Sequence, residues 1–185
     1  QVFTSGGRSF DPNNPDDLKL FRVRHDLVSI LEQDLDDGQR GVVLRTVQRR
    51  RGKSSLLKML PTQVGTTTTV SYTTFQELSG EERAPHRVVV DDVAAALAQN
   101  NLGFEVPPLD QVTDAWGSAL AWLKNVDDEL VKRNHRLLVC VDEVERIQDG
   151  VNDGWCNYTF LDFARATGDK LRHIRLLLTS AHLLT

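Results

Sequence analysis

The chain has 185 residues, 40% of them hydrophobic and 26% charged, which is an ordinary composition for a globular domain with a real core. The net charge of −4 excludes a basic surface that would bind polyanions over the whole molecule. No run approaches the roughly 18 apolar residues of a membrane span and no signal peptide is visible, so we expect a cytoplasmic protein.

The N-terminal segment 1–19 is rich in glycine, asparagine and proline and predicts an extended lead-in to one domain over 20–185. Apolar residues at helical spacing predict a first helix over 20–35, closed by a turn that ends at Gly38. The chain begins without a methionine and stops just after an apolar run. We therefore expect a piece of a larger protein, truncated at the C-terminus, or alternatively an incompletely ordered protein.

The stretch 40–60 organises the chain. Its apolar start predicts a strand over 40–46, and its amphipathic end predicts a helix over 53–60 that Pro61 terminates. A loop that closes around a polyphosphate needs inward N–H groups, a close-passing glycine, a lysine for the β- and γ-oxygens and a hydroxyl for Mg²⁺. Gly52-Lys53-Ser54 supplies these groups. The expected phosphate-binding residues are Gln48, Arg49, Arg50, Arg51, Gly52, Lys53, Ser54 and Ser55.

This loop departs from the usual pattern G-x-x-x-x-G-K-[ST], because Val47 stands where the first glycine belongs. Basic residues gather in the same short stretch, which favours a local anion site; they are Arg45, Arg49, Arg50, Arg51 and Lys53. A solvated basic turn is the alternative interpretation of this run.

Three elements are expected in the middle of the chain. A β-branched and aromatic run predicts a strand over 66–76, although its first half is alternatively a solvated loop. Helices are predicted from Pro85 to about Asn100 and from Asp110 to Arg133, with a polar interval between them. Trp116 and Trp122 are expected to be packing residues rather than a ligand cage.

Residues 136–141 form a continuous apolar run, which predicts a strand buried on both faces of a parallel sheet, with Cys140 as a small core residue. Asp142 and Glu143 follow at the carboxyl end, where open α/β sheets bind ligands and where buried carboxylates are costly without a use. We expect Asp142 to hold Mg²⁺, directly or through water, and Glu143 to polarise a water that attacks a γ-phosphate. The alternative is a polar turn in which Asp142 caps the next helix.

The last stretch predicts a helix over 155–167, with Tyr158, Leu161, Phe163 and Ala164 as its apolar residues, and a short buried strand over 174–178. Thr179 and Ser180 end this strand. If it neighbours the strand over 136–141, one of them lies beside Asp142 and contacts the γ-phosphate or the attacking water. Otherwise they are ordinary polar residues at a strand end.

Together these stretches resemble the P-loop ATPases of the AAA+/STAND group, in particular a prokaryotic branch. The motifs of that branch read in outline "FvGRe", "llGpRRsGKTSLL", "llllDEfe" and "lllaGs". The matching stretches are 20–27, 44–57, 137–145 and 176–181, in the same order and at similar spacing. The paired arginines before the lysine, the Ser-Leu-Leu after it and the Asp-Glu after the strand are the specific parts.

The resemblance implies an α/β fold, a three-layer sandwich around a mostly parallel central sheet of the ASCE type, without the C-terminal lid. It also implies that ATP lies between the P-loop and the Asp-Glu strand. The roles it assigns are Lys53 on the β- and γ-phosphates, Ser54 and Asp142 on Mg²⁺, Glu143 as catalytic base, and Ser180 or its neighbour Thr179 as γ-phosphate sensor. Members of the group act as switches or scaffolds in signalling, cell death and phage defence. The resemblance therefore implies two kinds of partner: the nucleotides ATP and ADP, and either further copies of the chain or fused effector domains.

Departures from the family pattern bear on turnover more than on binding. Val47 resists the open backbone that the loop favours, and Val23 replaces the glycine of the lead-in motif. The fifth core strand, the lid helices and a sensor arginine are not found in the chain, and no arginine finger can be assigned.

Three functions are compatible with these patterns. The first is a slowly hydrolysing ATP switch that controls the assembly of a larger protein, which the intact Lys53, Ser54, Asp142 and Glu143 favour. The second is a pseudo-ATPase scaffold whose nucleotide site Val47 weakens. The third is a DNA-associated AAA+ protein, which would need a basic face or a helix-turn-helix that the sequence does not display.

Overall fold

The computed structural model describes residues 42–46, 57, 60–62, 64–76, 78, 84–109 and 114–180. The strands are β1 (Val42–Thr46), β2 (Thr68–Thr74), β3 (Arg136–Asp142) and β4 (Ile174–Ser180). The helices are α4 (Pro85–Gln99), α5 (Ala115–Lys132), α6 (Glu145–Asn152) and α7 (Thr159–Lys170). The predicted lead-in 1–19 and the predicted helix over 20–35 lie outside the described residues.

The strands form one parallel, four-stranded sheet in the order β1-β4-β3-β2. Parallel strands must be joined by crossovers, and helices cover the faces as a result. The apolar runs of β3 and β4 are buried on both faces, as their sequences predict. The predicted α/β class with a parallel central sheet is therefore confirmed.

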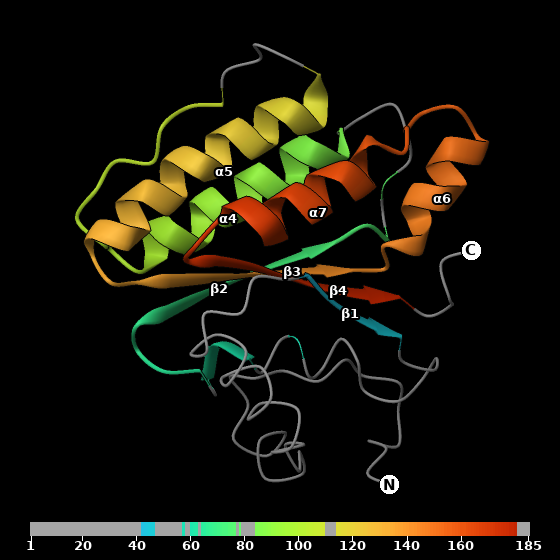
Figure 1. Cartoon of the computed structure of the whole chain (residues 1–185). Helices are drawn as coiled ribbons and strands as arrows, with labels where there is room; N and C mark the ends of the chain where they lie inside the picture. The colour runs from blue at the N-terminus through green and yellow to red at the C-terminus, as the bar shows by residue number, and fades with distance from the viewer. Residues whose placement is uncertain are drawn as a thin grey trace, which may run out of the picture.

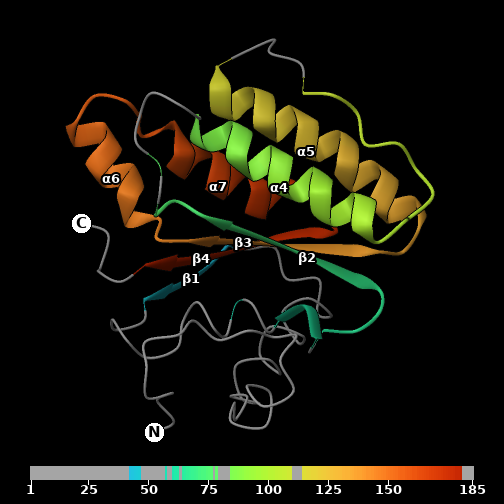
Figure 2. The same cartoon turned by 180° about the vertical axis from the view of Figure 1, so that it is seen from behind.

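Helices α4, α5 and α7 cover one face of the sheet (Figures 1 and 2). The core beneath them is built from side chains of every one of these helices and of β3 and β4. Trp116 and Trp122 are 4% and 3% exposed, so both are packing residues, as expected. The aromatic rings of Trp116 and Phe160 meet edge to face, with their centroids 5.0 Å apart.

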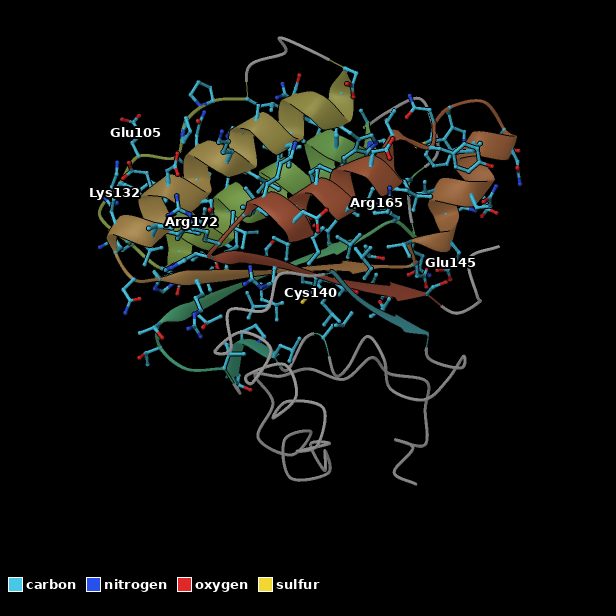
Figure 3. The ribbon with its side chains drawn as sticks, viewed as in Figure 1. Glu105, Lys132, Cys140, Glu145, Arg165 and Arg172 are labelled. Carbon is cyan, nitrogen blue, oxygen red and sulfur yellow. The ribbon has the colours of Figure 1, made fainter. Side chains whose placement is uncertain are left out.

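The opposite face carries a second apolar cluster, formed by Leu57, Leu60, Leu138, Cys140 and Leu177. Leu57 and Leu60 are helical and come from the stretch that follows the phosphate loop, so a helical segment forms the third layer. Cys140 projects from the sheet on this side (Figure 3), and burial raises the pKa of its thiol. The three-layer prediction and the core role of Cys140 are both confirmed.

The helix of this third layer does not end at Pro61 as predicted. Pro61 and Thr62 are themselves helical, and the Val64 N–H donates to the Leu60 carbonyl oxygen at 3.0 Å. A proline lacks its own N–H but leaves the donors that follow it intact, so a helix can continue for part of a turn beyond it.

The C-terminal helices differ from the sequence prediction. α6 was not predicted, and α7 begins at Thr159 rather than at 155. Tyr158 and Leu161 were expected to be part of an apolar stripe, but their exposed fractions are 56% and 47%, whereas Phe160 is buried. The stripe of α7 therefore passes through Phe160, Phe163, Ala164 and Thr167.

The middle elements agree more closely. α4 matches its predicted bounds, and α5 begins at Ala115, with the Asp114 side chain accepting from the Gly117 N–H at 2.9 Å. Strand β2 is shorter than predicted, because 66–67 form a turn. Among the helices that the structure describes, none has both the length and the hydropathy that crossing a bilayer requires.

Candidate functional site

The carboxyl edge of the sheet gathers the polar ends of its strands. In the parallel register, Thr46 of β1 pairs with Ser180 of β4, and Thr74 of β2 pairs with Asp142 of β3. β1 ends at this edge, so the chain leaves the sheet here on its way into the Gly52-Lys53-Ser54 loop. The expected phosphate-binding residues 48–55 themselves lie outside the described residues.

Asp142 is the centre of the site. Its carboxylate is 1% exposed, and its Oδ1 accepts hydrogen bonds from the Thr179 hydroxyl at 2.6 Å and from the Glu143 N–H at 2.8 Å. The Tyr72 hydroxyl donates to the other oxygen, Oδ2, at 3.4 Å. Hydrogen bonds of this kind make a buried carboxylate tolerable and hold it in one orientation.

Glu143 has an uncommon backbone conformation, with φ at 58°. A residue with a Cβ is strained in this left-handed region, and such strain concentrates at functional sites. The Asp142 carboxylate holds the strained peptide by accepting the Glu143 N–H, while the Glu143 carbonyl accepts the Arg146 N–H at 3.0 Å. The turn thereby places Glu143 directly after the buried carboxylate, at the edge of the sheet.

The strand neighbour that Asp142 was expected to have is present. β4 lies beside β3, and Thr179 is the strand-end residue that touches Asp142. Thr179 also accepts the Val144 N–H on its carbonyl oxygen at 3.1 Å, so it holds the turn after β3 at two points. Ser180 is 1% exposed and pairs in register with Thr46.

Asp142 does not cap the following helix. Val144 occupies the N-cap position of α6, without a capping hydrogen bond from its side chain. The helix itself lies at the carboxyl edge of the sheet, with Glu145 at its start (Figure 3). Asp142 and Glu143 thus lie at the carboxyl edge of the sheet, and the roles that the sequence suggests for them stay predictions.

The hydrogen bond from Tyr72 to Asp142 was not predicted from the sequence. The alternation of Tyr72 with Ser71 and Thr73 predicted the strand but gave no reason to connect a tyrosine on β2 with a carboxylate on β3. The connection depends on the order and register of the strands, which place Tyr72 opposite Cys140, two residues before Asp142.

No family model matches the sequence, and no curated protein matches it. Solved structures similar to it include the following two. One is the ORC2 protein of Aeropyrum pernix in ADPNP and ADP complexes, with a TM-score of 0.60 and 18% identity over 93% of this chain and 44% of that chain. The other is a Walker-type ATPase of Pyrococcus abyssi, with a TM-score of 0.56 and 17% identity over 88% of this chain and 46% of that chain. The chain thus has the fold of P-loop ATPases and spans less than half the length of either protein.

Proposed function

We propose that this domain binds ATP at the carboxyl edge of its sheet and hydrolyses it slowly. The observation that carries the proposal is the buried Asp142, fixed by Thr179 and followed by the strained Glu143, at the edge from which β1 leads into the Gly52-Lys53-Ser54 loop. The similarity to a Walker-type ATPase and to a protein solved with ADPNP and ADP supports it at the level of the fold.

The residues divide the work of phosphoryl transfer. Lys53 and the amides of the loop stabilise the charge of the β- and γ-phosphates, since this reaction depends on electrostatic stabilisation and positioning. Glu143 accepts a proton from the water that attacks the γ-phosphate in line. Thr179, or Ser180 beside it, contacts the γ-phosphate or that water.

The site suits Mg²⁺, which favours a few carboxylate and hydroxyl oxygens together with substrate phosphates over an all-protein cage. Asp142 offers a hard oxygen donor in a fixed orientation, and Ser54 would supply the hydroxyl. When bound, the ion would neutralise charge on the phosphate oxygens. Among the residues that the structure describes, no three His, Cys, Asp or Glu side chains gather as a separate metal site.

In the larger protein, we propose that the nucleotide state controls self-association or a fused effector domain, as in the signalling and defence switches of the STAND group. The resemblance of the sequence motifs supports this role. The short coverage of the similar structures leaves room for further domains.

The proposal is tested by Mg-ATP binding, measured by calorimetry on this domain and on Lys53→Ala. We expect micromolar affinity for the wild type and a loss of about 10- to 150-fold in the variant, the worth of one or two charged hydrogen bonds. Lys124→Ala, an exposed lysine on α5, is the matched control and should bind like the wild type.

Wild-type binding that Lys53→Ala leaves unchanged would refute the site assignment. No binding, both by this domain and by a longer chain that contains it, would favour the pseudo-ATPase scaffold. A salt-sensitive shift of duplex DNA would instead support the DNA-associated function.

A further inference from the structure

The Asp142 carboxylate is held by hydroxyl groups from the strands on both of its sides. Thr179 on β4 donates to Oδ1 at 2.6 Å, and Tyr72 on β2 donates to Oδ2 at 3.4 Å. Each of these hydrogen bonds restricts rotation of the carboxylate about its Cβ–Cγ bond, and Tyr72 acts on the oxygen that Thr179 and the Glu143 N–H do not contact. Tyr72 therefore contributes to the direction in which Oδ2 presents its lone pairs.

Tyr72 is also placed between this carboxylate and the helical layer of the opposite face. Its partly buried ring packs against the cluster that contains Leu57 and Leu60, the residues of the helix that follows the phosphate loop. The same side chain thus touches the apolar support of that helix with its ring and Asp142 with its hydroxyl.

We propose that Tyr72 is a positioning residue, which sets the orientation of the Asp142 carboxylate for Mg²⁺ bound with the nucleotide. The inference rests on the proposed function. Mg²⁺ demands nearly ideal octahedral geometry, and loss of a partner that orients a ligand typically lowers metal affinity by 10- to 100-fold. Tyr72→Phe keeps the ring and removes only the hydroxyl.

The chain offers an internal control, because it contains 2 tyrosines. Tyr158 is 56% exposed, and its hydroxyl accepts from the Gln148 side chain at 3.2 Å, away from the carboxylate. With 3-fluorotyrosine incorporated, the protein gives two ¹⁹F signals, which Tyr158→Phe assigns. In the absence of nucleotide and metal, Asp142→Asn should move the Tyr72 signal and leave the Tyr158 signal in place.

The second measurement is the Mg²⁺ dependence of ATP binding, by calorimetry at a series of Mg²⁺ concentrations. Tyr72→Phe should raise the Mg²⁺ concentration for half-maximal enhancement about tenfold, with an unchanged affinity for ATP in the absence of Mg²⁺. Tyr158→Phe should behave like the wild type in this titration. A merely structural role for Tyr72 would instead lower both affinities together.

The outcomes separate the two proposals. A Tyr72 signal that ignores Asp142→Asn, or a wild-type Mg²⁺ titration in Tyr72→Phe, overturns the positioning role while ATP binding stands. If the wild type binds no ATP at any Mg²⁺ concentration, the nucleotide proposal itself has failed, and the role given to Tyr72 fails with it. Lys53→Ala is a control for the ¹⁹F measurement, because this variant should lose affinity for ATP and keep the Tyr72 signal of the wild type.

Discussion

At the scale of single residues, Glu143 combines a strained backbone with the role proposed for it, that of the catalytic base. Of the described residues other than glycine, three have a positive φ, and the other two are Asn101 and Asn134. Asparagine tolerates this region far better than glutamate does, because its short amide can bond to the local backbone. A glutamate here costs stability, which is the expected mark of a residue kept for its chemistry.

Glu143→Gln is expected to bind Mg-ATP like the wild type and to lose turnover by about 10²- to 10⁴-fold, the usual contribution of a general base. The amide keeps the size of the side chain but cannot accept the proton of the attacking water. Phosphate release measured beside calorimetric affinity checks both halves of this expectation. A variant that turns over normally would remove Glu143 from the base role.

Glu143→Asn should raise the free energy of unfolding by about 0.5 to 1 kcal/mol while abolishing turnover, because asparagine relieves the left-handed strain. The reciprocal change Asn134→Glu, at an exposed position with φ at 49°, should lower it by a similar amount. Urea titrations of both variants and of the wild type measure these changes in the free energy of unfolding. Equal stabilities for Glu143→Asn and the wild type would argue against strain at this position.

At the scale of elements, α5 is tied to the start of β4 through a buried carboxylate. Asp127 is 3% exposed and accepts the backbone N–H groups of Arg172 and His173 at 3.0 and 2.7 Å. These donors precede the strand and have no ladder partner at that point, so the side chain of a helix satisfies them. The contact holds the backbone just before β4, so it helps to fix the register of β4 against β3 and with it the position of Thr179.

Asp127→Ala should lower the free energy of unfolding by about 2 to 4 kcal/mol, because it leaves two N–H groups without their acceptor. The adjacent Asp128 is exposed, and Asp128→Ala should change stability by less than about 0.5 kcal/mol. Urea unfolding followed by tryptophan fluorescence compares them. Similar losses in both variants would show that general helix charge, rather than this contact, is responsible.

The elements that the sequence predicted well are those with one dominant pattern. The apolar runs of β3 and β4 allow only buried strands, and the stripe of α5 allows only a helix. α6 could not be found in this way, because its sequence ERIQDGVN buries only Ile147 and Gly150. Tyr158 and Leu161 were misplaced because apolar residues at helical spacing do not reveal which of them other elements cover.

The candidate site was predictable in its residues but not in its contacts. Asp142 and Glu143 stand out as carboxylates after a buried strand, a local pattern. The roles of Thr179 and Tyr72 depend on which strands flank β3, and strand order is a property of the whole sheet. The sequence left open whether Thr179 or Ser180 lies beside Asp142, and the arrangement of the strands in the structure gives the Thr179 hydroxyl a hydrogen bond to Asp142.

At the scale of the whole molecule, the fold buries two histidines, His86 on α4 and His135 just before β3. Burial lowers the pKa of His86, with a smaller effect from Arg87, and burial with a smaller effect from His173 lowers the pKa of His135. His135 shares a hydrogen bond of 2.9 Å with the Thr69 hydroxyl of β2. Burial thus favours the neutral form of both rings.

The fold should therefore lose stability as the pH falls below about 6.5, the ordinary pKa of histidine. Below that pH the unfolded chain takes up protons that the buried rings resist, so unfolding becomes more favourable. Urea titrations between pH 5 and 8 measure the slope. In the double variant His86→Gln/His135→Gln the slope over this range should flatten, and an unchanged slope would assign it to other groups.

The parallel pairing of β1 with β4 has a consequence for how the chain acquires its structure. Val42 pairs with Leu176, so the first described strand meets the last one across nearly the whole domain. Contacts this distant in sequence carry the largest loop-closure entropy and form late. On the ribosome, β2, β3 and the helices can assemble while β1 waits for β4 to emerge. The strand that leads into the proposed phosphate loop would then join the sheet last. If the proposed function holds, a nascent chain could not bind nucleotide before its core is complete.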